Sequence, residues 1–383
     1  MGLVLSGLSL ACTLGGSAPP TGALSSKEHD FYRSRASFAE LFHEARRVRL
    51  EGVPEFALSP RPLIKAVNQR GDLIVVDKYN VRNVFVFGSD GRPKGRIGSE
   101  GRQAGQYLFP NDLFYDPRDR NYYIYDGDLM RISRFSGDFG FVRQFTVPLM
   151  VESILVTSQD RLFGYSAVVG TAKASGDMLY EVDRQGRILG RFARRPNSYS
   201  GWVASEQGGV VEVRGFLYLS TPYEYSISIF SQDGERLLSR EYASPHYVPP
   251  HPPPQLNDRS QVPEAFVAYQ QSYSDLRQIL SFDDKMIGVV FSEPEGIPVF
   301  LSLFGLDLTP LAQDLELPPY LGDLFAAGDR LYLMSPQREE RLGMVLNPVV
   351  VEYELKQPVT PRTAAAGPAP AHSAPMRGRL DPR

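Results

Sequence analysis

The sequence predicts an all-β protein, a six-bladed β-propeller, and three observations support this class. The 383 residues include 20 tyrosines, 22 phenylalanines, 34 glycines and 31 prolines, a composition typical of many strands and turns. A strand followed by a tight turn recurs along the chain, and the residues before the turns are Phe87, Phe135, Val182, Phe230 and Phe304. An apolar strand precedes each of these, so a repeat of about 45 residues holds three to four strands, as a propeller blade does.

The number of blades depends on one insertion. The intervals between the aligned residues are 48, 47, 48 and 74 residues, and the long interval contains a Pro-rich insertion at 242–270. Removing about 26 residues there restores the period. One further period beyond Phe304 reaches Tyr353 in the last strand of the chain, which gives six repeats.

Within each repeat the strands follow in order. A strand of apolar alternation precedes the aligned one at 71–77, 121–128, 160–166, 215–221, 285–291 and 329–334, and shorter apolar strands come before it at 62–67, 111–116 and 152–157. Asp90-Gly91 and Asp233-Gly234 predict hairpin turns, because these residues tolerate positive φ. The Gly- and Arg-rich stretch 88–105 lacks the Lys-Ser/Thr of a phosphate-binding loop. We interpret it as a turn and a connection between blades.

The two ends of the folded region predict how the ring closes. Arg46 to Gly52 alternates charged with apolar residues and precedes the first repeat, so we expect an N-terminal strand that pairs with the last blade. Ser37 and Glu40 form a capping box that begins a short amphipathic helix over 37–46. The propeller then covers 46–356, after a linker and helix at 21–45. The Pro/Ala-rich tail, 357–383, is predicted to be disordered.

Residues 1–20 form the predicted leader. Gly2 to Ala11 is an uncharged apolar run of signal-peptide length, and it ends in "LSLAC". This ending resembles the lipobox of bacterial lipoproteins, in which Cys12 would carry the lipid, although Ser9 departs from that motif and no Lys or Arg precedes the run. We expect an exported protein of the periplasm or cell envelope, held to the membrane only through Cys12. The alternative is an ordinary N-terminal segment on a cytoplasmic interaction protein.

The stretches "GDLIVVDKYNVRNVFVFGSDGRPKGRIG", from Gly71, and "YYIYDGDLMRISRFSGDFGFVRQF", to Phe145, resemble the NHL-type repeat of bacterial six-bladed propellers, and the match extends over residues 62–145. In later repeats the resemblance is limited to the spacing of strands and turns. It implies that loops between blades share one face with loops joining second to third strands. On that face we expect a ligand-binding surface that includes Arg82, Asp126, Asp128, Arg131, Trp202, Tyr223, Tyr225, Arg338 and Arg341, together with the insertion.

Charge and residue types limit the function classes. The net charge of −3 argues against a nucleic-acid partner. None of the five histidines lies on a predicted inner strand, which argues against the zinc site of NHL-type lyases. We therefore predict a monomeric, non-enzymatic scaffold, without a cofactor, that binds a protein, peptide or glycan. The alternative is a lactonase- or lyase-like enzyme with a divalent ion in the channel, for which Asn111, Asp112 and Glu152 are the candidate oxygen ligands.

Overall fold

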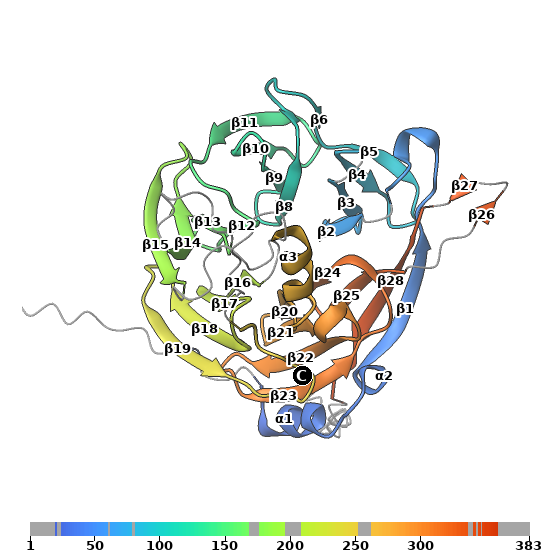
Figure 1. Ribbon diagram of the computed structural model, residues 1–383. Helices are drawn as coiled ribbons and strands as arrows, with labels where there is room; N and C mark the ends of the chain where they lie inside the picture. Colours follow the sequence, from blue (N-terminus) through green and yellow to red (C-terminus); the bar gives the residue numbers. More distant parts are fainter. Residues whose placement is uncertain are drawn as a thin grey trace, which may run out of the picture.

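Six four-stranded antiparallel sheets form a closed ring in the computed structural model (Figure 1). The structure describes residues 20, 24–59, 62–78, 81–167, 176–195, 208–251, 262–335, 340–341, 344–345 and 347–358. The all-β, six-bladed class predicted from the sequence is confirmed.

Each blade contributes its strands from the centre of the ring outward. The first four blades are β2 (Leu63–Val67), β3 (Leu73–Asp77), β4 (Asn83–Phe87) and β5 (Pro93–Arg96); β8 (Pro110–Asp116), β9 (Asn121–Asp126), β10 (Arg131–Phe135) and β11 (Phe141–Thr146); β12 (Ser153–Val156), β13 (Leu162–Tyr165), β14 (Asp177–Val182) and β15 (Ile188–Arg194); and β16 (Gly209–Val213), β17 (Phe216–Ser220), β18 (Ser226–Ser231) and β19 (Arg236–Glu241).

The fifth blade follows the same order, and the sixth takes its outermost strand from the N-terminus. These blades are β20 (Leu276–Phe282), β21 (Met286–Ser292), β22 (Val299–Gly305) and β23 (Pro310–Glu316); and β24 (Leu321–Ala327), β25 (Arg330–Met334), β28 (Val349–Leu355) and β1 (Phe42–Arg49). Smaller elements are α1 (Ser26–Arg33), α2 (Phe38–Leu41), α3 (Val262–Gln270), the 3-10 turns Pro54–Phe56 and Pro294–Gly296, and the pairs β6 (Ser99–Glu100) with β7 (Gln106–Tyr107) and β26 (Glu340–Arg341) with β27 (Met344–Val345).

The ring closes as predicted, through pairing of β1 with β28. Val48 lies opposite Val350 and Glu44 opposite Tyr353 in an antiparallel register. The strand spans 42–49 rather than 46–52, and the helix predicted over 37–46 ends at Leu41. The capping box of Ser37 and Glu40 is present, but from Phe42 onward the edge of β28 offers the backbone partners that outweigh helical propensity.

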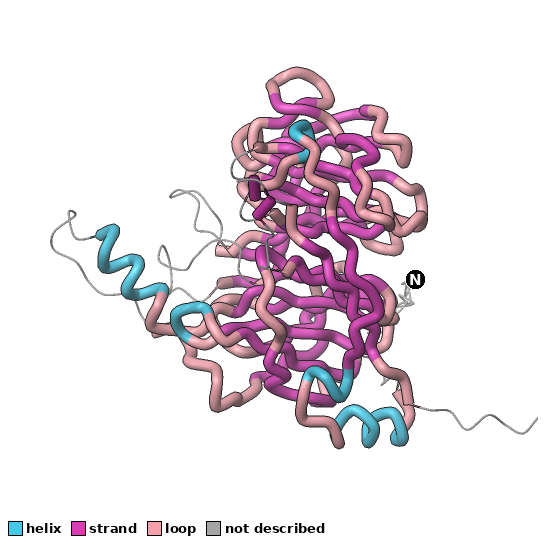
Figure 2. The backbone as a smooth tube through the Cα atoms, turned by 90° about the vertical axis from the view of Figure 1, so that its right-hand side faces the viewer, coloured by secondary structure: helices cyan, strands magenta, loops and turns pink. Residues whose placement is uncertain are grey.

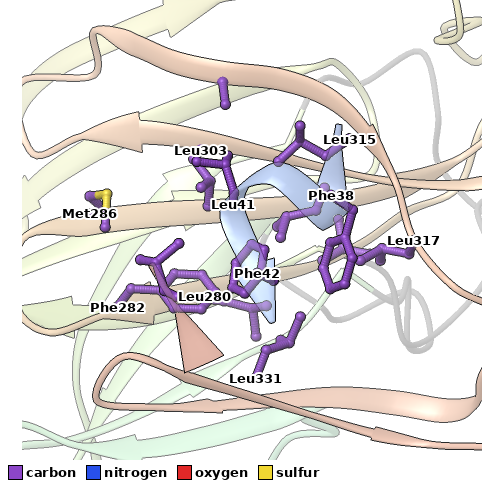
Figure 3. Close-up of a cluster of buried hydrophobic side chains, with 14 of the residues drawn as sticks. Phe38, Leu41, Phe42, Leu280, Phe282, Met286, Leu303, Leu315, Leu317 and Leu331 are labelled. Atoms are coloured by element: carbon purple, nitrogen blue, oxygen red, sulfur yellow. The ribbon is translucent and has the colours of Figure 1, made fainter. Parts of the chain in front are cut away.

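The core consists of six apolar clusters, each between two neighbouring blades. The cluster of Ile74 and Val86 with Leu113 and Ile124, for example, joins blades 1 and 2. Both faces of most strands are therefore buried, and β3 is buried over its whole length. In the cluster between blades 5 and 6, Phe38, Leu41 and other N-terminal side chains pack among leucines of both blades (Figure 3).

Helix α1, which was not predicted, also packs into the apolar cluster between blades 5 and 6. Tyr32 is 1 % exposed in the cluster between blades 5 and 6, and Arg33 Nε donates to the carbonyl of Pro310 at 3.2 Å. A capping box of Ser25 and Glu28 begins the helix. The sequence Ser-Ser-Lys-Glu has the spacing of a capping box, so the start of this helix could have been predicted from the sequence. No helix in the described ranges has the length and apolar character to cross a membrane.

Candidate binding face

The two faces of the ring differ in the chain that covers them. All six inner strands begin at one face, which we call the mouth face. It carries the connections between blades and those between second and third strands. Short turns such as 88–92 and 183–187 occupy the opposite face, whereas the connection from β19 to β20 on the mouth face runs from 242 to 275. Helix α3, in that connection, stands out from this face (Figure 2).

A central channel of about 420 Å³ passes between the inner strands of all six blades. Its lining is mixed along its length. Five charged residues lie on or just before the inner strands, close to the mouth: Lys65, Asp112, Glu152, Arg277 and Asp323. The deeper part is lined by apolar side chains together with Tyr115, Glu212 and Ser281. A concave site with a few converging polar groups is the usual form of a ligand pocket.

One ammonium group links two carboxylates near the mouth. Lys65 Nζ lies 3.2 Å from Asp112 and 2.8 Å from Asp323. Burial alone would lower the pKa of Lys65, but the two carboxylates together hold it above its ordinary value. Burial likewise disfavours the charged form of Asp323, yet Lys65 holds the pKa of this carboxyl below its ordinary value. Burial raises the pKa of Asp112 despite the contact with Lys65.

Of this triad, Asp323 is the carboxylate that the channel exposes. Its side chain is 37 % exposed, compared with 6 % for Asp112. Asp112 also accepts a hydrogen bond from the backbone N–H of Ile154 at 2.8 Å. The triad therefore presents one ionised carboxylate to the channel, while the other is engaged by Lys65 and by the backbone.

The three candidate metal ligands are engaged with protein groups. The amide of Asn111 donates to the carbonyl of Val151 at 3.1 Å, and Lys78 donates to its oxygen at 3.4 Å. Glu152 accepts from the N–H of Ala167 at 2.8 Å. Across the described ranges, no three His, Cys, Asp or Glu side chains lie close enough together to hold a metal ion.

Two of the predicted binding residues stabilise connections between blades. Asp126 is buried, and its carboxylate accepts backbone hydrogen bonds from Leu108 at 2.8 Å and from Phe109 at 3.3 Å. Arg131 is also buried, and its guanidinium donates to the carbonyls of Arg102, Gln103 and Gln106 in the same connection. These two side chains point into the protein rather than to the solvent of the mouth face.

The predicted tyrosines are buried as well. Tyr223 donates to the carbonyl of Ala167 at 3.0 Å, which joins blade 4 to blade 3. Tyr225 is 3 % exposed in the cluster between blades 4 and 5. Its ring centroid lies 5.0 Å from that of Phe291 and 5.2 Å from that of Tyr247. The insertion thus packs on Tyr225 and covers it.

The other predicted residues are exposed or lie outside the described residues. Arg82 is exposed, with its guanidinium 3.9 Å from Glu100, and Asp128 is an exposed turn residue. Arg341 belongs to β26, but its side chain is not described. Trp202, Arg338 and the anchor residue Cys12 lie outside the described residues.

The first part of the insertion is fixed to blade 5. His246 stacks on Phe300 with ring centroids 4.3 Å apart, and its Nδ1 lies 2.7 Å from Glu293. Val248 and Ser274 exchange hydrogen bonds across the base of the insertion, at 2.8 and 2.9 Å. These contacts hold residues 242–251 and 271–275 against the mouth face.

Exposed apolar side chains gather on the mouth face. Nine large ones are exposed among the described residues, and six of them belong to connections on this face: Val53, Met130, Met150, Val248, Val267 and Ile297. Ile297 is 76 % exposed. Contiguous exposed apolar surface marks interaction sites, and the connections of the mouth face carry most of the exposed apolar side chains from which such a surface could form.

Sequence reasoning missed Lys65 and Asp323, as well as the exposed apolar residues. A lysine inside the apolar strand "LIKAV" was a usable signal, because a charged residue on an inner strand faces either the channel or a neighbouring blade. Nothing in the sequence placed Asp323 beside it, because the two residues are 258 positions apart.

Six four-stranded blades around a channel define a six-bladed β-propeller. The chain belongs to the family DUF5128, described as a 6-bladed beta-propeller, whose model matches residues 28–245. No curated protein matches the sequence.

The chain is similar to solved structures at low sequence identity. A protein of Bacteroides fragilis NCTC 9343 described as exported is similar with a TM-score of 0.63 and 12 % identity, over 84 % of this chain and 97 % of that one. A member of the DUF4221 family from Bacteroides vulgatus is similar with a TM-score of 0.60 and 10 % identity, over 83 % and 98 %. A gluconolactonase from Xanthomonas campestris has a TM-score of 0.49 and 12 % identity, over 82 % and 99 %.

Proposed function

We propose that this chain is a non-enzymatic binding module of the bacterial cell envelope, which binds a protein, peptide or glycan on its mouth face. The observation that carries the proposal is the asymmetry of the ring. Long connections, six exposed apolar side chains and the channel mouth occur together on one face, while short turns cover the other. Binding residues concentrate on loops that a rigid scaffold positions.

The arrangement at the channel mouth favours binding over metal-dependent catalysis. Lys65 lies between Asp112 and Asp323, where it supplies the positive charge that a divalent ion would otherwise provide. An ion at this point would be repelled by the ammonium group. We therefore assign the channel to ligand recognition.

Export and anchoring belong to the same proposal. The apolar run before Cys12 supports a lipoprotein leader, and the spacing of strands and turns supports NHL-like repeats. In this proposal the protein acts as a monomer, has no nucleic-acid partner and contacts the membrane only through its anchor. Labelling of cells with a fatty-acid analogue tests the anchor: the wild type carries the label and Cys12→Ser does not, whereas equal labelling would refute it.

Two substitutions on the mouth face test the binding surface. Ile297→Asp and Val267→Asp each place a charge on an exposed apolar position, so neither disturbs the core. The purified protein is screened against a glycan array and a displayed peptide library, and the affinity of the strongest binder is then measured. We expect each substitution to weaken binding about tenfold, because the introduced carboxylate would be buried in the interface without a partner.

The matched control adds the same charge on the opposite face. Gln185 is an exposed turn residue there, and Gln185→Asp is expected to bind like the wild type. An absence of any glycan or peptide binder would contradict the proposal. So would a ligand whose affinity falls as much with Gln185→Asp as with Ile297→Asp.

A further inference from the structure

The outer strands of blades 1 to 5 share a one-residue bulge at the same position. In each blade the third and fourth strands form one residue pair next to the hairpin turn that joins them. The following residue of the fourth strand has no partner, and pairing resumes at the residue after it. The skipped residues are Lys94, Val142, Leu189, Leu237 and Leu311. A bulge turns its side chain away from the regular pleat, and here it does so on the rim of the ring.

Blade 5 shows what covers this position. Leu311 is 2 % exposed, because helix α1 packs on β23; Tyr32 of the helix and Leu24 just before it share one apolar cluster with Leu311. Figure 1 shows α1 against β23 at the rim. In blade 5, therefore, the bulge residue of the outer strand packs under a short amphipathic helix, and we call such a position a seat.

The same seats on blades 2 to 4 have no such cover among the described residues. Leu189 is 59 % exposed and Val142 48 %, while Leu237 is half-buried. An open hollow of about 660 Å³ lies along β19, and it is lined by Leu237 and Leu238 together with the polar residues Arg236, Ser239, Glu224 and Glu241. Of the nine large apolar side chains that are exposed among the described residues, three lie outside the connections of the mouth face. They are Phe141 and the bulge residues Val142 and Leu189.

The charges on the outer strands β11, β15 and β19 indicate what kind of helix would pack on them. Between them β11, β15 and β19 carry Arg143, Arg191, Arg194, Arg236 and Arg240, against a single acid, Glu241; the turn before β19 adds Glu235. No ion pair within the described residues uses any of these five arginines. By contrast β23, which α1 covers, carries Asp314 and Glu316 and no Lys or Arg. Charged residues on edge strands discourage edge-to-edge aggregation, which accounts for the arginines but not for the exposed Val142 and Leu189.

We propose that the rim of blades 2 to 4 docks an acidic amphipathic helix of a partner protein, seated on Leu189 as α1 is seated on Leu311. Apolar residues on one face of the helix cover the bulge side chains, and its acidic residues pair with Arg191 and Arg194. Figure 1 shows β11, β15 and β19 in succession along the rim, so neighbouring seats are available to a longer partner. This surface is separate from the mouth face, and the proposal is independent of the ligand bound there.

The test uses two synthetic peptides of about 25 residues, because isolated helices shorter than about 12–15 residues are only marginally stable in water. Both carry leucines at helical spacing; one has glutamates at the remaining positions and the other has lysines. Binding to the full chain is measured by fluorescence anisotropy. We expect the acidic peptide to bind at least about tenfold more tightly than the basic one, and the difference to shrink as salt screens the charges. Equal affinities for the two peptides would overturn the proposal.

Substitutions on the rim locate the site. Leu189→Asp and Arg191→Glu are each expected to weaken binding of the acidic peptide about tenfold, and the double variant Arg191→Glu/Arg194→Glu to favour the basic peptide instead. Ala45→Asp is the control, because Ala45 is an exposed bulge residue on the outer strand of blade 6. Wild-type affinity in Leu189→Asp would refute the assignment. Self-association that Leu189→Asp abolishes would show instead that a second copy is the occupant.

Discussion

At the residue scale, one turn position shows how neighbouring blades are fitted together. The fourth residue after each aligned position has positive φ in five blades, and it is Gly91, Phe139, Gly186, Gly234 or Leu308. Where it is glycine, the turn lies directly against the outer strand of the preceding blade: a Cβ on Gly186 would come within 1.8 Å of the carbonyl oxygen of Thr146. Where it is Leu308, the side chain is fully buried between blades instead.

Substitution of Gly186 separates this close approach from backbone strain. Gly215 has nearly the same φ, 83° against 84°, but open space around it. Gly215→Ala is expected to cost only the left-handed strain, about 1–2 kcal/mol of the free energy of unfolding. Gly186→Ala is expected to cost at least about 2 kcal/mol more, because backbone must move. Urea denaturation of both variants measures the difference, and equal costs would contradict this account of the glycine.

At the scale of elements, the closing strand β1 stabilises two blades at once. It pairs with β28 over seven residue pairs, from Phe42 to Arg49. Val48 and Leu50 also pack against Ile64 and Leu73 of blade 1. The strand is thus the outer edge of blade 6 and part of the interface between blades 6 and 1.

A charge on the inner face of β1 is expected to open the ring. Val48 is 4 % exposed, so Val48→Asp would bury an unpaired carboxylate and lower the free energy of unfolding by about 3 kcal/mol or more. Ala45→Asp adds the same charge at an exposed position of the same strand and is expected to cost less than about 0.5 kcal/mol. Limited proteolysis alongside urea denaturation checks both. Similar behaviour of the two variants would show that β1 does not hold the ring.

The strands were more predictable than their register. Apolar alternation and turn residues predicted the strands and the closing strand, because each signal is local. The helix predicted over 37–46 was wrong beyond Leu41, since pairing with a distant strand decided the conformation from Phe42 onward. The bulges at Val142 and Leu189 depend on which residues face each other across two strands, and composition and period do not specify that.

At the scale of the whole molecule, local sequence signals likewise do not specify which distant residues meet in the candidate site. The repeat period predicted six blades, so the existence and direction of the channel followed from the sequence. Which side chains meet in the channel did not follow, since Lys65, Asp112 and Asp323 come from three different blades. Aspartate and arginine at loop positions suggested a binding surface, but Asp126 and Arg131 hold connections together inside the protein.

Buried tyrosines distributed around the ring predict a sharp loss of stability in alkali. Burial raises the pKa of Tyr32 to about 12, and that of Tyr125 to about 12, from the ordinary value of 10.0. A raised pKa means that the folded protein keeps protons which the unfolded chain releases. The stabilisation is therefore complete below pH 10 and is lost as the pH rises toward 12.

Denaturation at a series of pH values checks this expectation. The free energy of unfolding should be steady near neutral pH and fall above about pH 10, together with the appearance of tyrosinate absorbance. Tyr125→Phe should reduce the steepness of the fall, because one raised group is removed. A free energy of unfolding that stays constant to about pH 11 would contradict the burial of these hydroxyl groups.

The pairing of β1 with β28 has a consequence for how the protein is made. Arg46 and Glu352, which are bonded across this pair, lie 306 positions apart. The ribosome therefore produces the closing strand long before its partner. Until then the growing chain carries an unsatisfied strand edge and bare apolar side chains, the features that attract chaperones and proteases. A polypeptide that ends shortly before Val349 would contain five complete blades but would lack β28, the partner of β1. Its unpaired first strand would therefore stay exposed to chaperones and proteases.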